Sequence, residues 1–360
     1  MNGSRELPVP ASARQDAVSP PRDVGRTASG ETVHAYDLGN ARGMTATVLT
    51  YGGIIQSLHV PDARGGSADV VLGFASLDPY LGRHPYFGAV TGRVAGRITG
   101  GRFTVDGREY ALACNDGGNH LHGGVTGLDK RVWRAEAGDG ALVLRYRSPD
   151  GEEGYPGTAD LAVTYRVTDA NELVIDTEVT VDRATPVSLT NHSYFNLAGE
   201  GEGTVEDHVL TIAAGEYVSA DAQLTLSGQR ETVDGKANDL RSPRRLGGVI
   251  PGLHRQHGDH YLLPASAGAV RHVARVAEPR SGRVMDVSTD DDGLQFYTGW
   301  FLDGSVVGKS GRAYPRFGGF CLECQGYPDG ADHPGLGAII VRPGEPRRRR
   351  TVYAFSVSAA

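Results

Sequence analysis

The chain is poor in cysteine, in excess positive charge and in long apolar runs, and each shortage excludes a class of protein. Three cysteines among 360 residues are too few for a disulfide framework and are typical of a reducing compartment. A formal net charge of -7 argues against a nucleic-acid-binding protein, which needs a basic surface. No apolar stretch reaches the roughly 18 residues of a membrane span, and the first residues lack the apolar core of a signal peptide. We therefore expect a soluble, cytoplasmic protein with neither nucleic-acid nor membrane partners.

Sustained helical periodicity is also missing, and short strands are indicated instead. Apolar residues alternate with polar or small ones in several segments, for example at Leu161, Val163 and Tyr165. This period of two is typical of a strand that buries one face. Asp106-Gly107 separates two further segments and is a dipeptide favoured in tight hairpins. The sequence therefore predicts an all-β protein, built as a large antiparallel β-sandwich.

The first 28 residues differ from the rest in composition. They are rich in proline, alanine, serine and arginine and show no period. Such a segment cannot bury enough apolar surface to offset the entropy lost on ordering, so residues 1–28 are predicted to be a disordered tail. Residues 29–360 contain no interior linker and no repeat of fixed length, which indicates one domain.

Three motif-like stretches are interpreted without a function. Arg347–Arg350 is the only dense basic run and is interpreted as a solvated loop. Cys321 and Cys324 form a CxxC pair, but no second pair accompanies them to bind zinc. His120 and His122 have the spacing of ligands on one strand face, yet no third ligand follows at a recognisable spacing. We therefore expect no metal and no cofactor.

A strand-like segment around His192 carries polar groups on one face. Thr190, His192, Tyr194 and Asn196 alternate with other residues and so share that face. A row of hydrogen-bonding side chains suits a polyhydroxylated ligand. An ordinary solvated face with a structural histidine is the competing interpretation.

A second segment places one carboxylate in an otherwise uncharged strand. Glu323 lies between Cys321 and Gln325, its neighbours on the same face. Carboxylates are seldom buried unless they are paired or used, and partial desolvation raises the pKa of a glutamate towards that of a general base. A structural, hydrogen-bonded glutamate remains the alternative from this strand alone.

Several blocks, taken together and in this order, resemble the aldose 1-epimerase, or galactose mutarotase, family over about residues 30–357. The blocks are Tyr51-Gly52-Gly53-Ile54, Gly92-Arg93-Val94-Ala95-Gly96-Arg97-Ile98, Asn119-His120-Leu121-His122-Gly123-Gly124, Gly154-Tyr155-Pro156-Gly157, Thr190-Asn191-His192-Ser193-Tyr194, Gly258-Asp259-His260, Gln295-Phe296-Tyr297-Thr298-Gly299 and Cys321-Leu322-Glu323-Cys324-Gln325-Gly326-Tyr327-Pro328-Asp329. Each block alone is weak, whereas the ordered series is specific.

The resemblance implies a β-sandwich with a concave sugar-binding face and an isomerase activity. It implies that Glu323 is the general base and His192 the general acid in the interconversion of α and β anomers of a free aldose. The residues that it implies in sugar binding are His122, Arg93 and Asp259, with Asn119 and Gln295 in the pocket lining. No cofactor is implied, and the partner is a small-molecule sugar. A monomer and a homodimer are both compatible with the sequence.

Three other functions remain open at this point. A glycoside hydrolase would need two carboxylates, for which Asp259 and Glu323 could serve. A non-catalytic carbohydrate-binding domain would have no need of both Glu323 and His192. A family member that acts on a modified sugar, such as a sugar phosphate, would need further cations at the rim of the pocket.

Two positions depart from the family pattern. Gly96 and Trp300 stand where the family usually has asparagine. If either residue reaches the pocket, the loss of an amide leaves a sugar hydroxyl unmatched, and an indole offers a flat apolar surface. We therefore hypothesise a preference for a less polar aldose, such as a deoxysugar. Compensated packing away from the ligand is the alternative.

Overall fold

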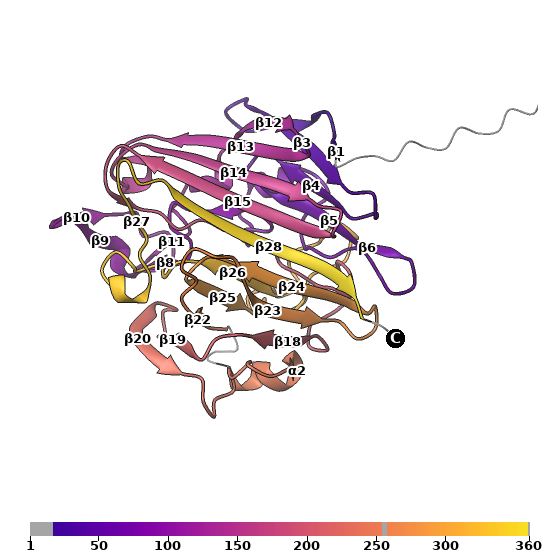
Figure 1. Cartoon of the computed structure of the whole chain (residues 1–360). Helices are drawn as coiled ribbons and strands as arrows, with labels where there is room; N and C mark the ends of the chain where they lie inside the picture. Colours follow the sequence, from indigo (N-terminus) through magenta and orange to yellow (C-terminus); the bar gives the residue numbers. More distant parts are fainter. Residues whose placement is uncertain (1–16, 254–257, 359–360) are drawn as a thin grey trace, which may run out of the picture.

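The computed structural model describes residues 17–253 and 258–358, which fold mainly into antiparallel strands (Figure 1). The largest sheet has nine strands in the order β12-β13-β14-β15-β28-β24-β23-β18-β21. Their bounds are β12 Arg134–Gly138, β13 Ala141–Ser148, β14 Ala159–Val167, β15 Glu172–Val181, β28 Arg347–Val357, β24 Arg283–Thr289, β23 Arg271–Ala277, β18 Val209–Ile212 and β21 Arg244–Arg245. In Figure 1, β28 runs across the middle of the molecule between β15 and β24.

Two further sheets complete the main layers. One contains β1 Ala17–Val18, β2 Arg22–Arg26, β3 Thr32–Gly39, β4 Thr45–Leu49, β5 Ile55–Pro61 and β6 Ser67–Asp69. The other has the order β20-β19-β22-β25-β26, with bounds β20 Leu226–Thr232, β19 Glu216–Ala220, β22 His260–Leu262, β25 Gly293–Tyr297 and β26 Cys321–Gln325. This five-stranded sheet carries several residues of the candidate site.

Short pairs and helices connect these sheets. The pairs are β7 Val90–Thr91 with β17 Thr190–Asn191, β8 Arg97–Ile98 with β11 His120–Leu121, β9 Arg102–Val105 with β10 Arg108–Ala111, and β16 Thr185–Pro186 with β27 Ile340–Val341. The α-helices are α1 Asp78–Leu81 and α2 Leu246–Val249. Within residues 17–253 and 258–358, no helix has the length and apolarity needed to cross a membrane. The prediction of an all-β fold is confirmed.

The main hydrophobic core joins all three large sheets. It includes Leu38 of β3, Leu144 of β13, Val163 of β14 and Phe296 of β25, each at most 2% exposed. Leu161, Val163 and Tyr165 all point into it, as their alternation predicts. The Asp106-Gly107 dipeptide forms the predicted hairpin between β9 and β10, with both residues at positive φ.

The predicted boundary of the N-terminal tail is wrong. Residues from Ala17 onward already belong to the fold, because β1 and β2 pair with β3. Val18 packs against the main core and Val24 against a second apolar cluster, so backbone pairing and two apolar contacts order a segment whose composition suggested disorder. Residues 1–16, the remainder of the predicted tail, lie outside the described residues.

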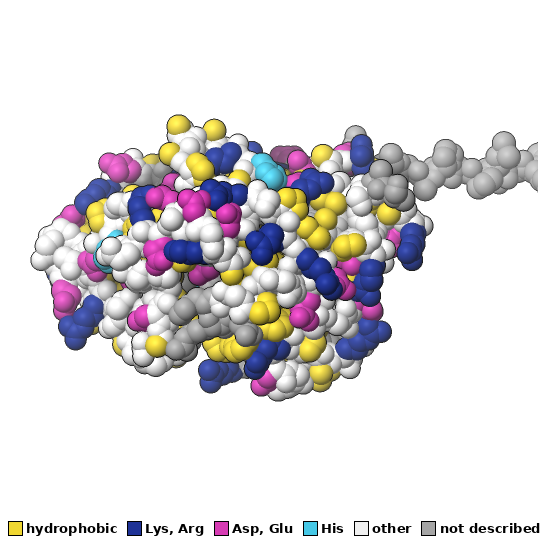
Figure 2. Space-filling view, turned by 90° about the horizontal axis from the view of Figure 1, so that it is seen from below, with side chains coloured by type: hydrophobic (Ala, Val, Ile, Leu, Met, Phe, Trp, Pro, Cys, Tyr) yellow, Lys and Arg dark blue, Asp and Glu magenta, His cyan; other side chains and the backbone are white. Residues whose placement is uncertain are grey.

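The basic run Arg347–Arg350 is a strand and not the solvated loop that its charge suggested. It opens β28 and pairs with β15. Arg348 bonds Glu178 at 2.9 Å and Arg350 bonds Asp176 at 2.5 Å, so carboxylates of the neighbouring strand compensate the charge. Acidic and basic side chains are likewise interspersed over the face of the molecule seen from below in Figure 2.

Candidate active site

A cavity of about 1250 Å³ lies over the five-stranded sheet. Its wall is built from β25 and β26, from the segment that follows β17, and from loops that include residues 81–86 and 301–306. The polar residues in the wall include His84, Arg97, Asp116, His122, His192, Asp259, Gln295, Glu323 and Gln325. Its size and its polar wall suit a small polyhydroxylated ligand.

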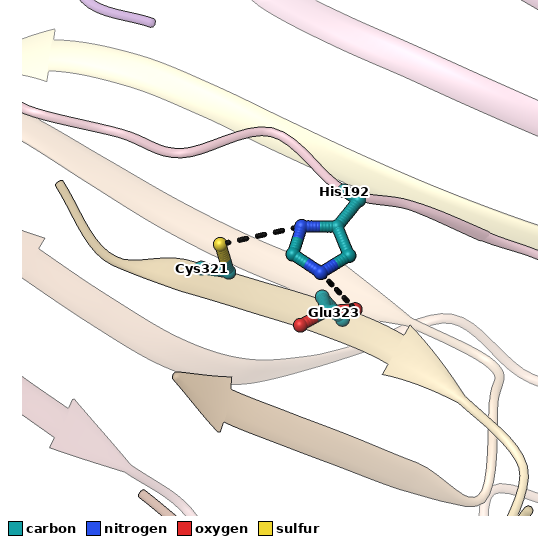
Figure 3. Close-up of side chains that lie close together, drawn as sticks. All are labelled: His192, Cys321 and Glu323. Atoms are coloured by element: carbon teal, nitrogen blue, oxygen red, sulfur yellow. Dashed lines mark hydrogen bonds and ion pairs between the residues drawn. The ribbon is translucent and has the colours of Figure 1, made fainter. Parts of the chain in front are cut away.

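His192 and Glu323 meet in this cavity. The imidazole Nε2 lies 3.6 Å from the carboxylate Oε2, and the two side chains are 6% and 3% exposed (Figure 3). Leu322 and Cys324 of β26 point into the main core, so the alternation of the strand turns Glu323 towards the cavity. The structure therefore brings together the two residues that the sequence predicts as acid and base.

Main-chain hydrogen bonds fix the separation of this pair. Phe195, three residues after His192, forms an antiparallel bridge with Phe320, the residue before β26. Its amide donates to the Phe320 carbonyl at 2.7 Å, and the Phe320 amide donates back at 2.9 Å. The segment that carries His192 is thus tied to the strand that carries Glu323.

Two tyrosines also stack on the His192 ring. Tyr194 stacks on it with ring centroids 5.1 Å apart, and Tyr86 stacks at 5.9 Å. The backbone amide of His192 donates to Ala89 at 2.8 Å, and its carbonyl accepts from Gly88 at 3.0 Å. This confinement leaves the imidazole one orientation relative to the carboxylate.

Burial shifts the two pKa values in opposite directions. Desolvation raises the pKa of Glu323 to about 8, against the opposing charge of Arg97. Desolvation lowers the pKa of His192 to about 4. Between these values the pair holds a single proton, which is the condition for one group to accept while the other donates.

His122 presents a hydrogen-bond donor to the cavity. The Gly96 amide donates to its Nδ1 at 3.1 Å, so in the neutral ring Nε2 carries the proton. Burial lowers the pKa of His122 well below its ordinary value, and nearby His192 lowers it further, which keeps the ring neutral. Its backbone has a φ of 51°, in the left-handed region that non-glycine residues seldom occupy.

Asp259 and Gln295 line the same cavity, as the sequence predicts. Asp259 Oδ2 accepts from the Asn238 amide at 3.0 Å, whereas Oδ1 has no hydrogen-bond partner among the described residues. Burial raises the pKa of Asp259 to about 6. The Gln295 amide donates to the Phe296 carbonyl at 3.0 Å. Asp259 thus offers a buried acceptor for a ligand hydroxyl.

The prediction that Arg93 binds the sugar is wrong. Its guanidinium is 2% exposed and lies outside the cavity wall. It donates to Ser148 Oγ at 2.9 Å and to the carbonyls of Ser148, Pro149 and Pro156 at 3.0, 3.0 and 3.1 Å. Arg93 therefore anchors the loop between two strands of the large sheet.

Arg97 occupies the place that the sequence assigned to Arg93. It lines the cavity and donates to Asp116 at 2.7 Å. Its charge lowers the pKa of Glu323. The two arginines are four residues apart in one motif, and the motif alone does not say which of them faces the ligand.

Asn119 is likewise corrected, because it does not line the cavity. Its side-chain oxygen accepts from the Gly100 amide at 3.0 Å, and its backbone pairs with Asp116. This is a turn-stabilising role of the kind that asparagine side chains often have.

Gln325 is a cavity residue that the prediction did not include. Its side chain is 1% exposed, and Oε1 has no hydrogen-bond partner among the described residues. It follows Glu323 on the same face of β26, so the alternation of the strand was the signal that could have identified it.

The two departures from the family pattern have different outcomes. Trp300 is not part of the cavity wall. The Arg316 guanidinium carbon lies 4.0 Å from the centroid of its ring, and Phe317 packs beside it. Gly96 does line the cavity at a φ of 83°, and a Cβ there would lie 2.5 Å from Pro328 Cγ. The hypothesis of altered specificity therefore rests on Gly96 alone and no longer includes Trp300.

The two suspected metal motifs also separate in space. Cys321 faces the cavity side, whereas Cys324 packs in the main core. His120 bonds the Ala113 carbonyl through Nδ1 and the Tyr155 hydroxyl through Nε2, each at 2.8 Å. Neither pair presents two ligand atoms to one ion.

Comparison with known proteins identifies the family of the chain. The aldose 1-epimerase family model matches residues 34–354. The galactose mutarotase of Rattus norvegicus is 46% identical over 88% of this chain and 92% of its own length. The aldose 1-epimerase of Escherichia coli K12 is 34% identical over 91% and 96%. Among solved structures, an aldose epimerase homologue from C. elegans has a TM-score of 0.84 at 29% identity and covers 90% of this chain and 98% of its own. The chain therefore belongs to the aldose 1-epimerase family.

Proposed function

We propose that the chain interconverts the α and β anomers of a free aldose, with Glu323 as general base and His192 as general acid. The observation that carries this assignment is the buried pair itself, with 3.6 Å between Nε2 and Oε2 at the wall of a cavity.

Ring opening requires one proton to leave and another to arrive. Glu323 takes the proton of the anomeric hydroxyl, whose electron pair forms the carbonyl as the bond from C1 to the ring oxygen breaks. His192 gives its Nε2 proton to that ring oxygen. The open-chain aldehyde then rotates about its C1–C2 bond, and the reverse transfers close the ring on the other face. Each well-placed acid or base contributes roughly 10²- to 10⁴-fold to the rate.

The proton count of the pair suits a reaction that runs both ways. The pair carries one proton in total before opening and one after it, because Glu323 gains what His192 loses. The opposed pKa values of about 8 and about 4 favour this one-proton state over a wide range of pH. Either position of the proton is therefore accessible without exchange with solvent.

Donors and acceptors around the pair hold the sugar hydroxyls. His122 and Arg97 supply donors, and Asp259 Oδ1 and Gln325 Oε1 supply acceptors that no described residue satisfies. Buried polar atoms of this kind cost free energy unless a ligand pairs with them. We assign Gln295 to the same wall at the register position opposite Glu323.

We propose galactose as a substrate, because relatives 44% to 46% identical are named galactose mutarotases. A sugar phosphate is less well supported. Of the three cations in the cavity wall, Lys130 and Arg97 are each paired with a carboxylate at 2.7 Å, so Arg83 alone has no ion pair among the described residues and no cluster of free cations is present there. The free thiols of Cys114, Cys321 and Cys324 favour a cytoplasmic location. We propose no nucleic-acid or membrane partner, and either a monomer or a homodimer.

Polarimetry on freshly dissolved α-galactose and α-glucose tests the assignment. The protein should speed the approach to the equilibrium rotation in proportion to its concentration. A rate equal to that of buffer alone would overturn the proposed function. Release of an aglycone from aryl galactosides would instead support the glycoside hydrolase that Asp259 and Glu323 could form.

A further inference from the structure

The nitrogen of His192 that does not face Glu323 has a partner of its own. Cys321 Sγ lies 3.6 Å from Nδ1, while the carboxylate lies at the other ring nitrogen, Nε2 (Figure 3). Cys321 and Glu323 are two residues apart on β26 and so project from the same face. The strand thereby places a sulfur at one ring nitrogen and a carboxylate at the other.

Only one tautomer of the neutral ring can serve the proposed reaction. If Nε2 held the single proton of the neutral ring, Nε2 could not accept a proton from the sugar. Loss of that Nε2 proton to the sugar would leave an imidazolate anion. If Nδ1 holds that proton, Nε2 is free to accept one and later to return it. The position of the Nδ1 proton therefore decides whether His192 can work, and the group that bonds Nδ1 sets that position.

We propose that Cys321 is a positioning residue, whose sulfur accepts the Nδ1–H of His192 so that Nε2 alone exchanges the catalytic proton. This inference rests on the proposed function, because it assigns a role within the same acid–base pair. Cys321 touches neither the sugar nor the reacting atoms in this role. It acts through the imidazole.

A thiol differs from the carboxylate that orients histidine in many enzymes. Cys321 is fully buried, and burial together with nearby Glu323 raises the pKa of its thiol well above the ordinary value. The sulfur therefore stays neutral and orients the ring without adding a negative charge. A carboxylate in its place would stabilise the imidazolium and make it a weaker acid towards the sugar.

The other side chains around the imidazole do not compete for Nδ1. Tyr86 and Tyr194 stack on its faces, and His122 and Tyr297 meet it at angles of 75° and 73°. Glu323 lies at Nε2. Of the side chains around the ring, the sulfur is the one at Nδ1. A hydrogen bond between the ring and the backbone of His192 itself is the remaining polar contact.

The test combines nitrogen NMR with kinetics on Cys321→Ala and Cys321→Ser. Long-range proton–nitrogen spectra of protein with ¹⁵N-labelled histidine report the tautomer, and the signal lost in His192→Asn identifies His192. We expect the Nδ1–H form in the wild type and in Cys321→Ser, whose hydroxyl also accepts. Cys321→Ala should show a mixture, and its kcat should fall about 3- to 10-fold with KM unchanged.

Cys324→Ala is the matched control, because it removes a buried thiol from the same strand on the core side. It should leave the His192 tautomer as in the wild type. The inference is overturned if the wild type has the Nε2–H form, or if Cys321→Ala keeps the wild-type tautomer and kcat. Absence of mutarotation in the wild type would overturn the proposed function instead, while the spectra would still report whether sulfur sets the tautomer.

Discussion

Two glutamates on strands of this molecule have opposite surroundings. Glu178 lies on β15 and pairs with Arg348 at 2.9 Å, with side chains 47% and 67% exposed. Glu323 lies on β26, is 2% exposed and faces a histidine whose low pKa keeps it neutral near pH 7. An exposed ion pair contributes at most about 1 kcal/mol to the stability of the fold and changes the chemistry of its carboxylate little. Burial without a paired cation raises the pKa of Glu323 to about 8 and makes it a proton carrier.

The largest expected effect comes from removing the charge of each glutamate in turn. Glu323→Gln should lower kcat by at least about 10²-fold, because the amide cannot accept the anomeric proton. Glu178→Gln should leave kcat within about twofold, since it alters only an exposed pair. Polarimetry on both folded variants measures this. Comparable losses of kcat in the two variants would contradict the different roles assigned to the buried and the exposed glutamate.

A second pair of substitutions separates Arg97 from Arg93. Arg97→Gln should reduce kcat/KM by about 10- to 100-fold, because a charged hydrogen bond to the ligand is lost. Arg93→Gln should act mainly on stability, since it leaves buried carbonyls without their donor. Thermal unfolding and kinetics of both variants decide the matter. A loss of affinity in Arg93→Gln at unchanged stability would restore the sequence-based assignment.

The pH dependence follows from the opposed pKa values of the pair. Glu323 has its pKa raised to about 8, so above that pH the pair loses its only proton and kcat/KM should fall about tenfold per pH unit. Below about 4, where His192 also takes a proton, a second fall is expected. The plateau lies between the two values. Rates from pH 3 to pH 10 test this, and a profile that rises steadily through pH 8 would contradict the shared proton.

A smaller effect is expected at the N-terminus, where two truncations bracket the corrected boundary. Removal of residues 1–16 should change Tm by less than about 1 °C. Removal of residues 1–26 should lower Tm by more than about 2 °C, because it deletes β1 and β2, the strands that pair with β3 on one side. Calorimetry measures both. Equal melting temperatures in the two truncations would return the boundary to residue 28.

The smallest effect expected is none at all, on exhaustive dialysis against EDTA. Ligand atoms of His192, Cys321 and Glu323 lie within 4.8 Å of one another. The sulfur nevertheless lies at Nδ1 and the carboxylate at Nε2. A metal ion bound by one nitrogen of the ring would need the sulfur and the carboxylate on the side of that same nitrogen. Mutarotation should therefore survive dialysis unchanged. Activity that disappears and returns with a divalent metal would refute this.

Local patterns predicted much of the fold because they act over a few residues. The alternation around Val163 identified a strand, and Asp106-Gly107 identified a hairpin. The strand at Arg347–Arg350 could not be predicted from its charge, since the carboxylates that compensate it are distant in sequence. Glu178 and Asp176 on β15 lie about 170 positions earlier, and Asp291 and Asp292 lie 57 or 58 positions before Arg349.

The site was predictable to the extent that one strand face defines it. Glu323 stood out as the single carboxylate of an uncharged strand and His192 as a member of a row of polar side chains, and both line the cavity. Arg93 and Asn119 were misassigned because their partners come from distant turns, including the carbonyls of Ser148 and Pro149. Such partners set the direction of a side chain, and a motif does not contain them.

The paired backbone of Phe195 and Phe320 has a consequence for the thermodynamics of catalysis. A catalyst leaves the equilibrium ratio of two anomers unchanged, so it must speed opening and closure by the same factor. A separation between acid and base that depends on two main-chain hydrogen bonds is the same whichever anomer arrives. The active site has no forward direction, and the sugar alone determines which way the reaction proceeds.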